Sequence, residues 1–154
     1  MNALHVRIVE LEPMWVAAAY GFGPSPEEVA WANLVAWARP KGLLDAPEKQ
    51  RIFGFNNPNP SPGSPNYGYE FWIEVDAGVE PEGEIRVQEF VGGLYAVTGC
   101  VGVANITPTW KRLVEWVANS GYENGRHQWL EQHLGGDSAQ PDTLQLDLFM
   151  PIMA

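Results

Sequence analysis

The sequence predicts an α+β protein, built from two tandem strand-helix-strand-strand repeats that form one curved antiparallel sheet. Residues 6–43 align with residues 85–122 at a constant offset of 79, without a gap. Within each copy, short runs of β-branched residues precede a segment whose apolar residues recur at helical spacing. Trp31 and Trp110 fall in register in this alignment, which is hard to obtain by chance for so rare a residue.

A repeat of this length indicates two copies of one unit rather than a solenoid. We expect a single domain over residues 1–154, with one copy at about 4–76 and the other at about 84–153. Two such copies are usually related by a pseudo-twofold axis. The groove between them is a natural place for a ligand, so a central cleft is expected.

The first copy begins with strand-like residues 6–11 and 15–20, expected to pair as a hairpin. A helix follows from Pro26 to about Arg39, with Ser25 and Glu28 placed for a capping box. Its expected buried stripe is Trp31, Leu34, Val35 and Ala38.

Residues 54–68 hold four prolines and three glycines, which predicts a long loop rather than a helix or central strand. This loop is either a surface connection or a lid over a site. The next segment, residues 69–75, alternates strictly. Glu70 and Trp72 therefore face away from the side on which Tyr69 and Phe71 lie.

The second copy repeats the pattern, with strands at 85–90 and 94–98 joined by a Gly-Gly hairpin turn at 92–93. Thr107 is expected to cap its helix and Gly121 to end it. The expected buried stripe is Trp110, Leu113, Val114 and Val117. A last strand is expected from about 143 to 151.

With both helices on one side of the sheet, the other side offers Glu70, Trp72, Asp147 and Phe149. Carboxylates beside aromatic rings suit a cationic or amphipathic ligand, through charge pairing and cation–π contact. The alternative is that the two aromatic side chains only pack beneath the long loop.

Composition narrows the function further. The net charge is −10 and the pI about 4.6, which disfavours nucleic acid as a partner and favours cations, although such a surface can also serve solubility alone. The chain has only one cysteine, Cys100, and three histidines, which are few potential ligands for a metal ion. Neither a metal nor a cofactor is therefore expected. No apolar run approaches the length of a membrane span and no signal peptide is apparent, so a cytoplasmic location is expected.

Six motifs in this order resemble one known family, the GyrI-like small-molecule-binding domain, which is also the effector-binding half of multidrug-responsive MerR-type and AraC-type regulators. They are YGYE at 67–70, FVGGLYAV at 90–97, WKRLVEW at 110–116, SGY at 120–122, WLEQH at 129–133 and DLFMPI at 147–152. The resemblance covers nearly the whole chain. No single motif is specific, but their order and spacing are.

The resemblance implies a cleft with aromatic walls and a buried carboxylate, which falls at Glu131, and a bulky hydrophobic, often cationic, ligand. Candidate walls are Trp15, Trp72, Tyr95, Trp129 and Phe149, with Trp110 shared between wall and helix core. His133 stands where the family has tyrosine. Without the resemblance, the sequence would indicate that Glu131 is a solvated residue of a helix. No room precedes the first repeat for a DNA-binding half, so the stand-alone form is expected.

The sequence therefore predicts a receptor or sequestering protein for hydrophobic, cationic aromatic compounds. The first alternative is a hydrolase of reactive cyclopropane-bearing compounds, as the resemblance implies for some members, with Glu131 as general base and Tyr69 or Tyr67 polarising the leaving oxygen. The second is a protein-interaction or inhibitor module. A homodimer and an unidentified protein partner stay open.

Overall fold

The computed structural model describes residues 4–46, 48–57, 59–134 and 143–154, and the chain divides into two compact units. Residues Met14–Phe90 form what we call the central unit. Residues Met1–Pro13 and Val91–Ala154 together form the terminal unit. Each unit combines one long helix with an antiparallel sheet, which confirms the predicted α+β class.

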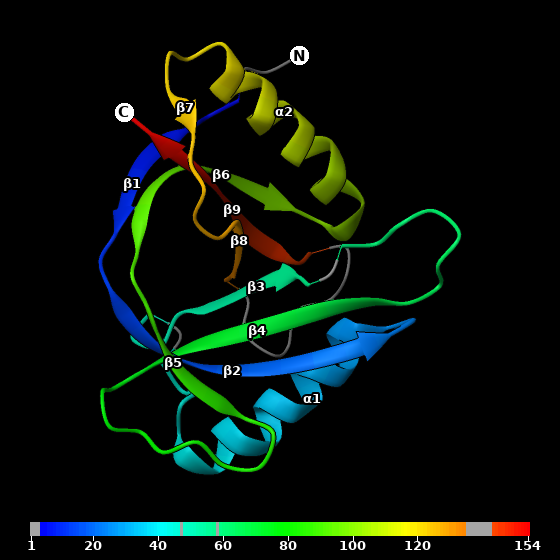
Figure 1. The fold of residues 1–154 in the computed structure, drawn as a ribbon, viewed down its shortest axis with the longest axis vertical. Coiled ribbons are helices and arrows are strands. Elements are labelled where there is room, and N and C mark those ends of the chain that lie inside the picture. The colour runs from blue at the N-terminus through cyan, green and yellow to red at the C-terminus, as the bar shows by residue number, and fades with distance from the viewer. Residues whose placement is uncertain (1–3, 47, 58, 135–142) are drawn as a thin grey trace. The chain divides into compact units, whose positions relative to one another are not determined.

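The central unit contains a four-stranded antiparallel sheet in the order β3-β4-β2-β5 (Figure 1). Its elements in chain order are β2 (Met14–Gly23), α1 (Pro26–Ala38), the 3-10 turn η1 (Arg39–Lys41), β3 (Ile52–Asn56), β4 (Tyr67–Val75) and β5 (Arg86–Phe90).

Helix α1 covers one face of this sheet and encloses the core of the central unit. Leu34 and Trp37 are buried there with Phe71 and Ile73 of β4, so the alternation read in residues 69–75 is confirmed. Trp37, rather than Val35, completes the buried stripe of the helix. The helix approaches β2 so closely that a Cβ on Gly21 would lie 2.3 Å from the Pro26 carbonyl oxygen.

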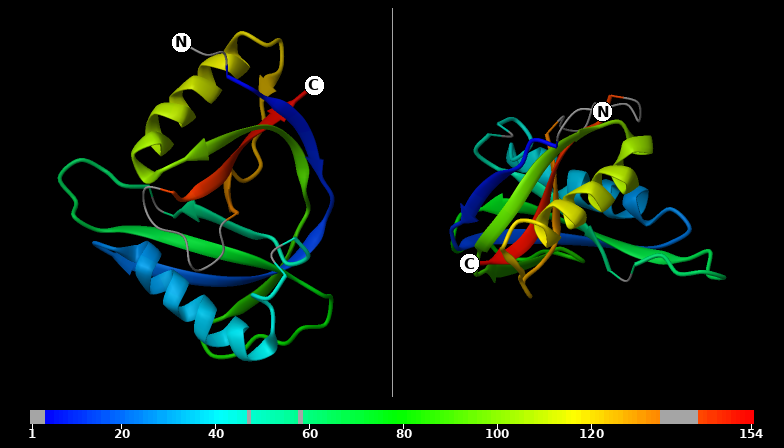
Figure 2. Two further views of the ribbon diagram at one scale, coloured as in Figure 1. Left: turned by 180° about the vertical axis from the view of Figure 1, so that it is seen from behind. Right: turned by 90° about the horizontal axis from the view of Figure 1, so that it is seen from above.

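The terminal unit has the same construction, with its strands in the order β1-β6-β9-β8 and β7 paired to β9 (Figure 2). Its elements are β1 (Arg7–Leu11), β6 (Gly93–Val101), the 3-10 turn η2 (Val103–Asn105), α2 (Ile106–Ala118), β7 (Glu123–Asn124), β8 (Leu130–His133) and β9 (Gln145–Met153).

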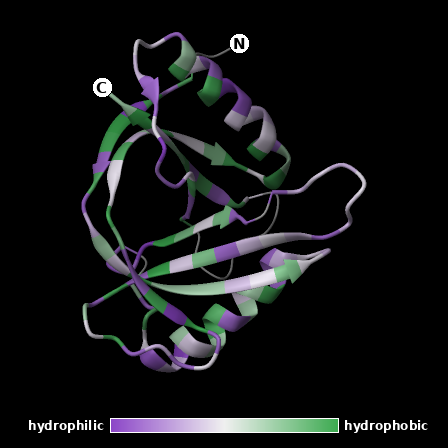
Figure 3. Cartoon of the chain, in the orientation of Figure 1, coloured by the Kyte–Doolittle hydropathy of each residue, from purple (hydrophilic) through white to green (hydrophobic). Residues whose placement is uncertain are grey.

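Helix α2 covers one face of the sheet of the terminal unit. Leu113 and Val117 are buried against Leu148 and Met150 of β9. Hydrophobic and hydrophilic residues alternate around the helix, as expected when only one side is buried (Figure 3). Val114 was expected in the buried stripe but is exposed, so the stripe is narrower than the spacing predicted.

Both predicted hairpins are wrong. Strand β1 pairs with β6 instead of β2, and β5 pairs with β2 instead of β6. Arg7 lies opposite Val97, and Arg86 lies opposite Ala18. The two arginines are 79 positions apart and so are the two residues opposite them, which means that the two pairings have the same register. Side-chain alternation fixes which face of a strand is buried, but it does not choose the neighbouring strand, which is why the pattern misled.

The predicted helix ends also need correction. Ser25 occupies the N-terminal cap of α1, but its side chain makes no capping hydrogen bond. Helix α2 begins at Ile106, so Thr107 lies within its first turn and Asn105 takes the cap position. Gly121 adopts a left-handed conformation at φ +90°, but it follows a helix that has already ended at Ala118.

The predicted loop at 54–68 is shorter than expected, because β3 extends to Asn56 and β4 begins at Tyr67. Gly54 is part of β3, where a Cβ would meet the Tyr69 hydroxyl at 2.3 Å, so the glycine makes room for that ring. Beyond β3, the Asn57 N–H donates to the Gly68 carbonyl at 2.8 Å.

Candidate functional site

The residues expected to bind ligand lie on two faces in each unit. On the helix-bearing face of the terminal unit lie Trp129 and Glu131, with Trp110 above them on α2. On the faces turned away from the helices lie Glu70 and Trp72 in the central unit, and Tyr95, Asp147 and Phe149 in the terminal unit. Trp15 lies on the helix-bearing face of the central unit.

Glu131 and two tryptophans form the first candidate site, which we call the tryptophan–glutamate cluster (Trp110, Trp129 and Glu131). Glu131 lies on β8 opposite Leu148, a core residue beneath α2, so its side chain shares the helix-bearing face. The indole N–H of Trp110 donates to Glu131 Oε2 at 3.0 Å. The two indole rings have centroids 5.4 Å apart at 51°.

This cluster can be reached from solvent. Trp129 is 40% exposed, and Trp110 and Glu131 are half-buried. A fixed carboxylate next to two indole faces offers charge pairing and cation–π contact to the same ligand. The interpretation of Glu131 as a solvated helical residue is wrong, because the residue lies on a strand.

His133 also faces the helix-bearing side, opposite Leu146 on the same pair of strands. Burial lowers the pKa of its imidazole to about 4, because the charged form loses hydration there. At neutral pH the ring is therefore uncharged and adds no positive charge near Glu131.

The second candidate site surrounds Glu70 on the other face of the central unit. Glu70 is one of the few buried polar side chains in the described part of the chain. Its Oε2 accepts the indole N–H of Trp72 at 2.6 Å, and its Oε1 pairs with Arg86 Nη2 of β5 at 2.9 Å. We call Glu70, Trp72 and Arg86 the Glu70 site.

Two phenylalanine rings pack against Trp72 at the Glu70 site. The Trp72 ring meets Phe55 edge-on at 4.9 Å and Phe90 at 5.2 Å between centroids. Tyr20 and Phe55 lie directly opposite Glu70 on the two neighbouring strands, so they share its face. The carboxylate is thus embedded in an apolar surrounding and depends on its two partners for stabilisation.

Asp147 takes the corresponding place in the terminal unit. It lies opposite Gly99, the residue 79 positions after Tyr20, and pairs with Arg7 at 2.7 Å. Phe149 stands where the central unit has Trp72, and it has no N–H to donate to the carboxylate. The two carboxylates expected on the helix-free faces therefore both have arginine partners.

Tyr95 is fully buried on the helix-free face of the terminal unit. Its ring meets Phe149 at 5.4 Å and His127 at 4.8 Å, and its hydroxyl donates to the Gln128 carbonyl. Burial raises the pKa of the phenol, so it stays neutral. Tyr95 contributes to the packing around Phe149.

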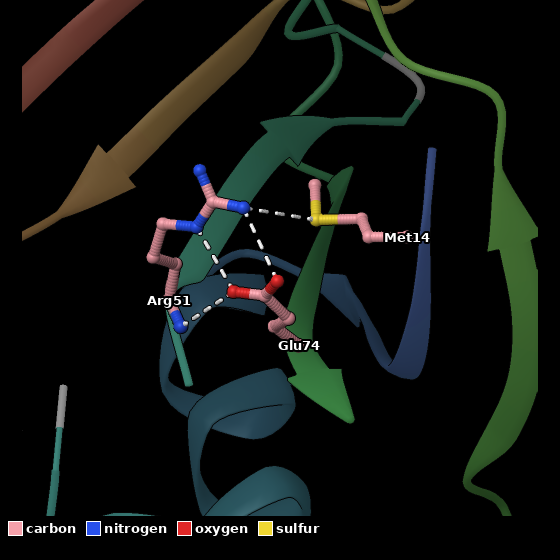
Figure 4. Close-up of polar contacts among 3 residues, drawn as sticks. All are labelled: Met14, Arg51 and Glu74. Carbon is pink, nitrogen blue, oxygen red and sulfur yellow. Dashed lines mark hydrogen bonds and ion pairs between the residues drawn. The ribbon is translucent and has the colours of Figure 1, made fainter. Parts of the chain in front are cut away.

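Glu74, the remaining acidic residue on the helix-free face of β4, is paired as well (Figure 4). Arg51 Nε and Nη2 donate to its two carboxylate oxygens at 2.9 and 3.2 Å, and Nη2 also contacts Met14 Sδ at 3.8 Å. This arginine holds Glu74 through a two-point contact and lies over the Phe53 ring at 5.8 Å.

Three other residues considered from the sequence occupy different surroundings. Trp15 lies opposite Val75 on the helix-bearing face of the central unit and is 38% exposed. Tyr69 is buried in the core beneath α1. Tyr67 donates its hydroxyl to both carboxylate oxygens of Glu27 at 2.8 Å; burial and this contact raise its pKa to about 12.

Sequence reasoning missed the two arginines. Arg7 and Arg86 align at the offset of 79, so the sequence contained a signal. The assumed hairpins, however, would have placed the strands of both arginines beside the wrong neighbouring strands. Phe55 and Phe90 were missed because one was assigned to the loop and the other to the wrong hairpin.

Within residues 4–46, 48–57, 59–134 and 143–154, no three His, Cys, Asp or Glu side chains gather closely enough to hold a metal ion. Neither long helix in these ranges has the length and apolar character to span a membrane.

The fold is that of an effector-binding domain. The chain belongs to the Cass2 family of integron-associated effector-binding proteins, whose model matches residues 7–152. No curated protein matches the chain in sequence.

Solved structures agree on this fold. The C-terminal domain of EcmrR shares 14% identity over 98% of each chain, with a TM-score of 0.71. A protein from Listeria innocua described as a hydrolase shares 12% identity over 96% of this chain and 91% of its own, at a TM-score of 0.70. SAV2435, solved with tetraphenylphosphonium bound, shares 10% identity over 98% of this chain and 95% of its own, at a TM-score of 0.57.

Proposed function

We propose that this protein binds a bulky, hydrophobic, aromatic cation at the tryptophan–glutamate cluster of the terminal unit. The observation that carries the proposal is the Glu131 carboxylate, held by the Trp110 indole N–H at 3.0 Å with the half-exposed Trp129 ring beside it. An aromatic cation would stack on the indoles while its charge pairs with the carboxylate.

Two further facts support a cationic ligand over an anionic one. The net charge of −10 raises the local concentration of cations around the protein and opposes the approach of anions. SAV2435, which has the same fold, was solved with the aromatic cation tetraphenylphosphonium. A cytoplasmic receptor or sequestering protein fits these properties and is part of the proposal.

The test is a titration with tetraphenylphosphonium, followed by tryptophan fluorescence and by calorimetry. We expect saturable quenching, and a loss of affinity of about tenfold or more in Glu131→Gln, since the variant removes the charge and keeps the shape. Glu123→Gln, an exposed residue of β7 in the same unit, is the matched control and should bind like the wild type. Neutral triphenylphosphine oxide should bind weakly to all three.

Equal affinity of Glu131→Gln and wild type for tetraphenylphosphonium would contradict the proposal. If no aromatic cation binds, the alternative that the protein is an interaction or inhibitor module would remain. The sequence does not indicate which partner such a module would bind.

The hydrolase alternative is kept because a protein of the same fold is described as a hydrolase. In that case Glu131 would act on a water molecule as general base. Tyr69 is an unsuitable acid, since its ring is buried beside Gly54 in the core of the central unit. Incubation with cyclopropane-bearing compounds and analysis of products would separate the two functions, because a receptor gives binding without turnover.

We also propose that the two halves of the chain derive from one duplicated sequence, as the offset of 79 suggests. The matching strand registers and the two arginine–carboxylate pairs support this. The ligand site then belongs to one copy, since the first copy has Gly54 and not a carboxylate at the place in its β3 strand that corresponds to Glu131.

A further inference from the structure

We propose that the Glu70 site of the central unit is a second cation-binding site, in which the Arg86 guanidinium is a built-in occupant that an external planar cation can displace. The ligand class is an aromatic amidinium or guanidinium compound. This site is separate from the tryptophan–glutamate cluster and uses none of its residues.

The carboxylate is already organised to receive a cation. Glu70 Oε2 is held by the Trp72 indole at 2.6 Å, a contact made two residues along the same strand. This contact does not involve Arg86, so the carboxylate keeps its direction when the arginine leaves. Oε1, the oxygen that Arg86 Nη2 reaches at 2.9 Å, would then be exposed to a new donor.

The surroundings favour a flat, aromatic cation over a hydrated metal ion. Phe55, Trp72 and Phe90 are buried, and the Trp72 centroid lies 4.9 Å from that of Phe55 and 5.2 Å from that of Phe90. Aromatic groups attract an organic cation, whereas a small inorganic ion would have to give up its water among apolar groups. A guanidinium group in contact with Glu70 shows that the site accepts this chemistry.

Arg86 is a displaceable partner. Its side chain is 57% exposed, while that of Glu70 is 6% exposed, so the arginine approaches a buried acid from the solvent. Strand β5 is at the edge of its sheet, paired only with β2 among the described residues. The guanidinium that leaves would be hydrated at once, so its displacement costs little, whereas an uncompensated Glu70 would cost much more.

The neighbouring ion pairs lack these features. Arg51 is held on both oxygens of Glu74 and by the Met14 sulfur, and Glu74 is more exposed than Glu70. In the terminal unit Asp147 lies beside Phe149, which has no N–H, and opposite Gly99 instead of an aromatic residue. These pairs are therefore matched controls within the same chain.

The experiment measures binding of benzamidinium by calorimetry to the wild type and to Arg86→Ala. A tethered side chain competes with an effective concentration in the millimolar range. Removing the tethered arginine should therefore tighten binding about tenfold or more. Benzamide, the neutral analogue of similar shape, should bind neither protein measurably, because it cannot pair with the carboxylate.

Four variants locate the effect. The double variant Glu70→Gln/Arg86→Ala should lose the tightened binding. Arg7→Ala and Arg51→Ala should bind benzamidinium like the wild type, since their partners Asp147 and Glu74 lack the indole-held carboxylate. Glu131→Gln/Arg86→Ala should keep the tightened binding, so failure of the proposed function and failure of this inference are distinguishable.

The inference is overturned if Arg86→Ala binds benzamidinium no more tightly than the wild type, or if the gain persists without the Glu70 carboxylate. Should Arg86→Ala not fold alone, benzamidinium but not benzamide is expected to restore its circular dichroism spectrum. Failure of benzamidinium to restore that spectrum equally overturns the inference.

Discussion

The hydrogen bond between Trp72 and Glu70 gives the sharpest test of the structural reasoning. The bond is short, at 2.6 Å, its acceptor is a carboxylate, and Glu70 is only 4% exposed. Hydrogen bonds to charged groups contribute about 1.5–3 kcal/mol. Trp72→Phe removes the donor and keeps an aromatic ring, as Phe149 does naturally in the terminal unit.

The smaller ring also leaves space in a packed region, which costs a further 1–2 kcal/mol or so. We therefore expect Trp72→Phe to lower the free energy of unfolding by about 3–5 kcal/mol, and the melting temperature by roughly 10 °C. Urea unfolding followed by far-ultraviolet circular dichroism measures this without relying on tryptophan fluorescence.

A double-mutant cycle separates the two contributions. In the background Glu70→Met, which has no acceptor, Trp72→Phe should cost only the packing term. The coupling between the two positions should therefore be about 1.5–3 kcal/mol. The same cycle at Trp110 and Glu131, where the acid is half-buried and the distance is 3.0 Å, should give less than about 1 kcal/mol. A coupling at Trp72 no larger than at Trp110 would refute the reasoning.

Three further predictions follow from single contacts. Arg51→Met should lower unfolding free energy by about 1 kcal/mol, since a two-point contact to Glu74 is lost; chemical denaturation with an unchanged midpoint would contradict this. Because the pKa of His133 falls from 6.5 unfolded to about 4 folded, stability should be full above pH 6.5 and decline toward pH 4; His133→Gln should flatten this decline in melts across that range. Gly21→Ala should cost about 2 kcal/mol or more, since its Cβ would meet the Pro26 carbonyl; a melting temperature within a degree of wild type would argue against that close packing.

The sequence predicted the faces of the strands better than their partners. Strict alternation in residues 69–75 placed Phe71 in the core and Glu70 on the opposite face, as the structure has them. The same pattern could not show that β1 belongs beside β6, because each candidate pairing buries the same apolar side chains. The pattern therefore could not show that β1 and β5 have exchanged their expected partners.

The sequence predicted which types of residue form the candidate site, but not on which face of the sheet each of them lies. Glu131 and Asp147 were grouped as ligand residues, yet they lie on opposite faces of the sheet of the terminal unit. The face of Glu131 depends on the register between β8 and β9, and a shift by one residue would reverse it. Sequence spacing alone does not fix that register across a long connection.

What the sequence determined by itself is the local structure: two helices with one buried side each, strands whose faces alternate, and an acidic and aromatic composition suited to cations. These properties follow from neighbouring residues and the periods of helix and strand. The tertiary structure alone decided that Arg86 meets Glu70 and that Trp110 meets Glu131. Such contacts join residues far apart in the chain, and only the pairing of whole strands and the packing of a helix on its sheet bring them within hydrogen-bonding distance.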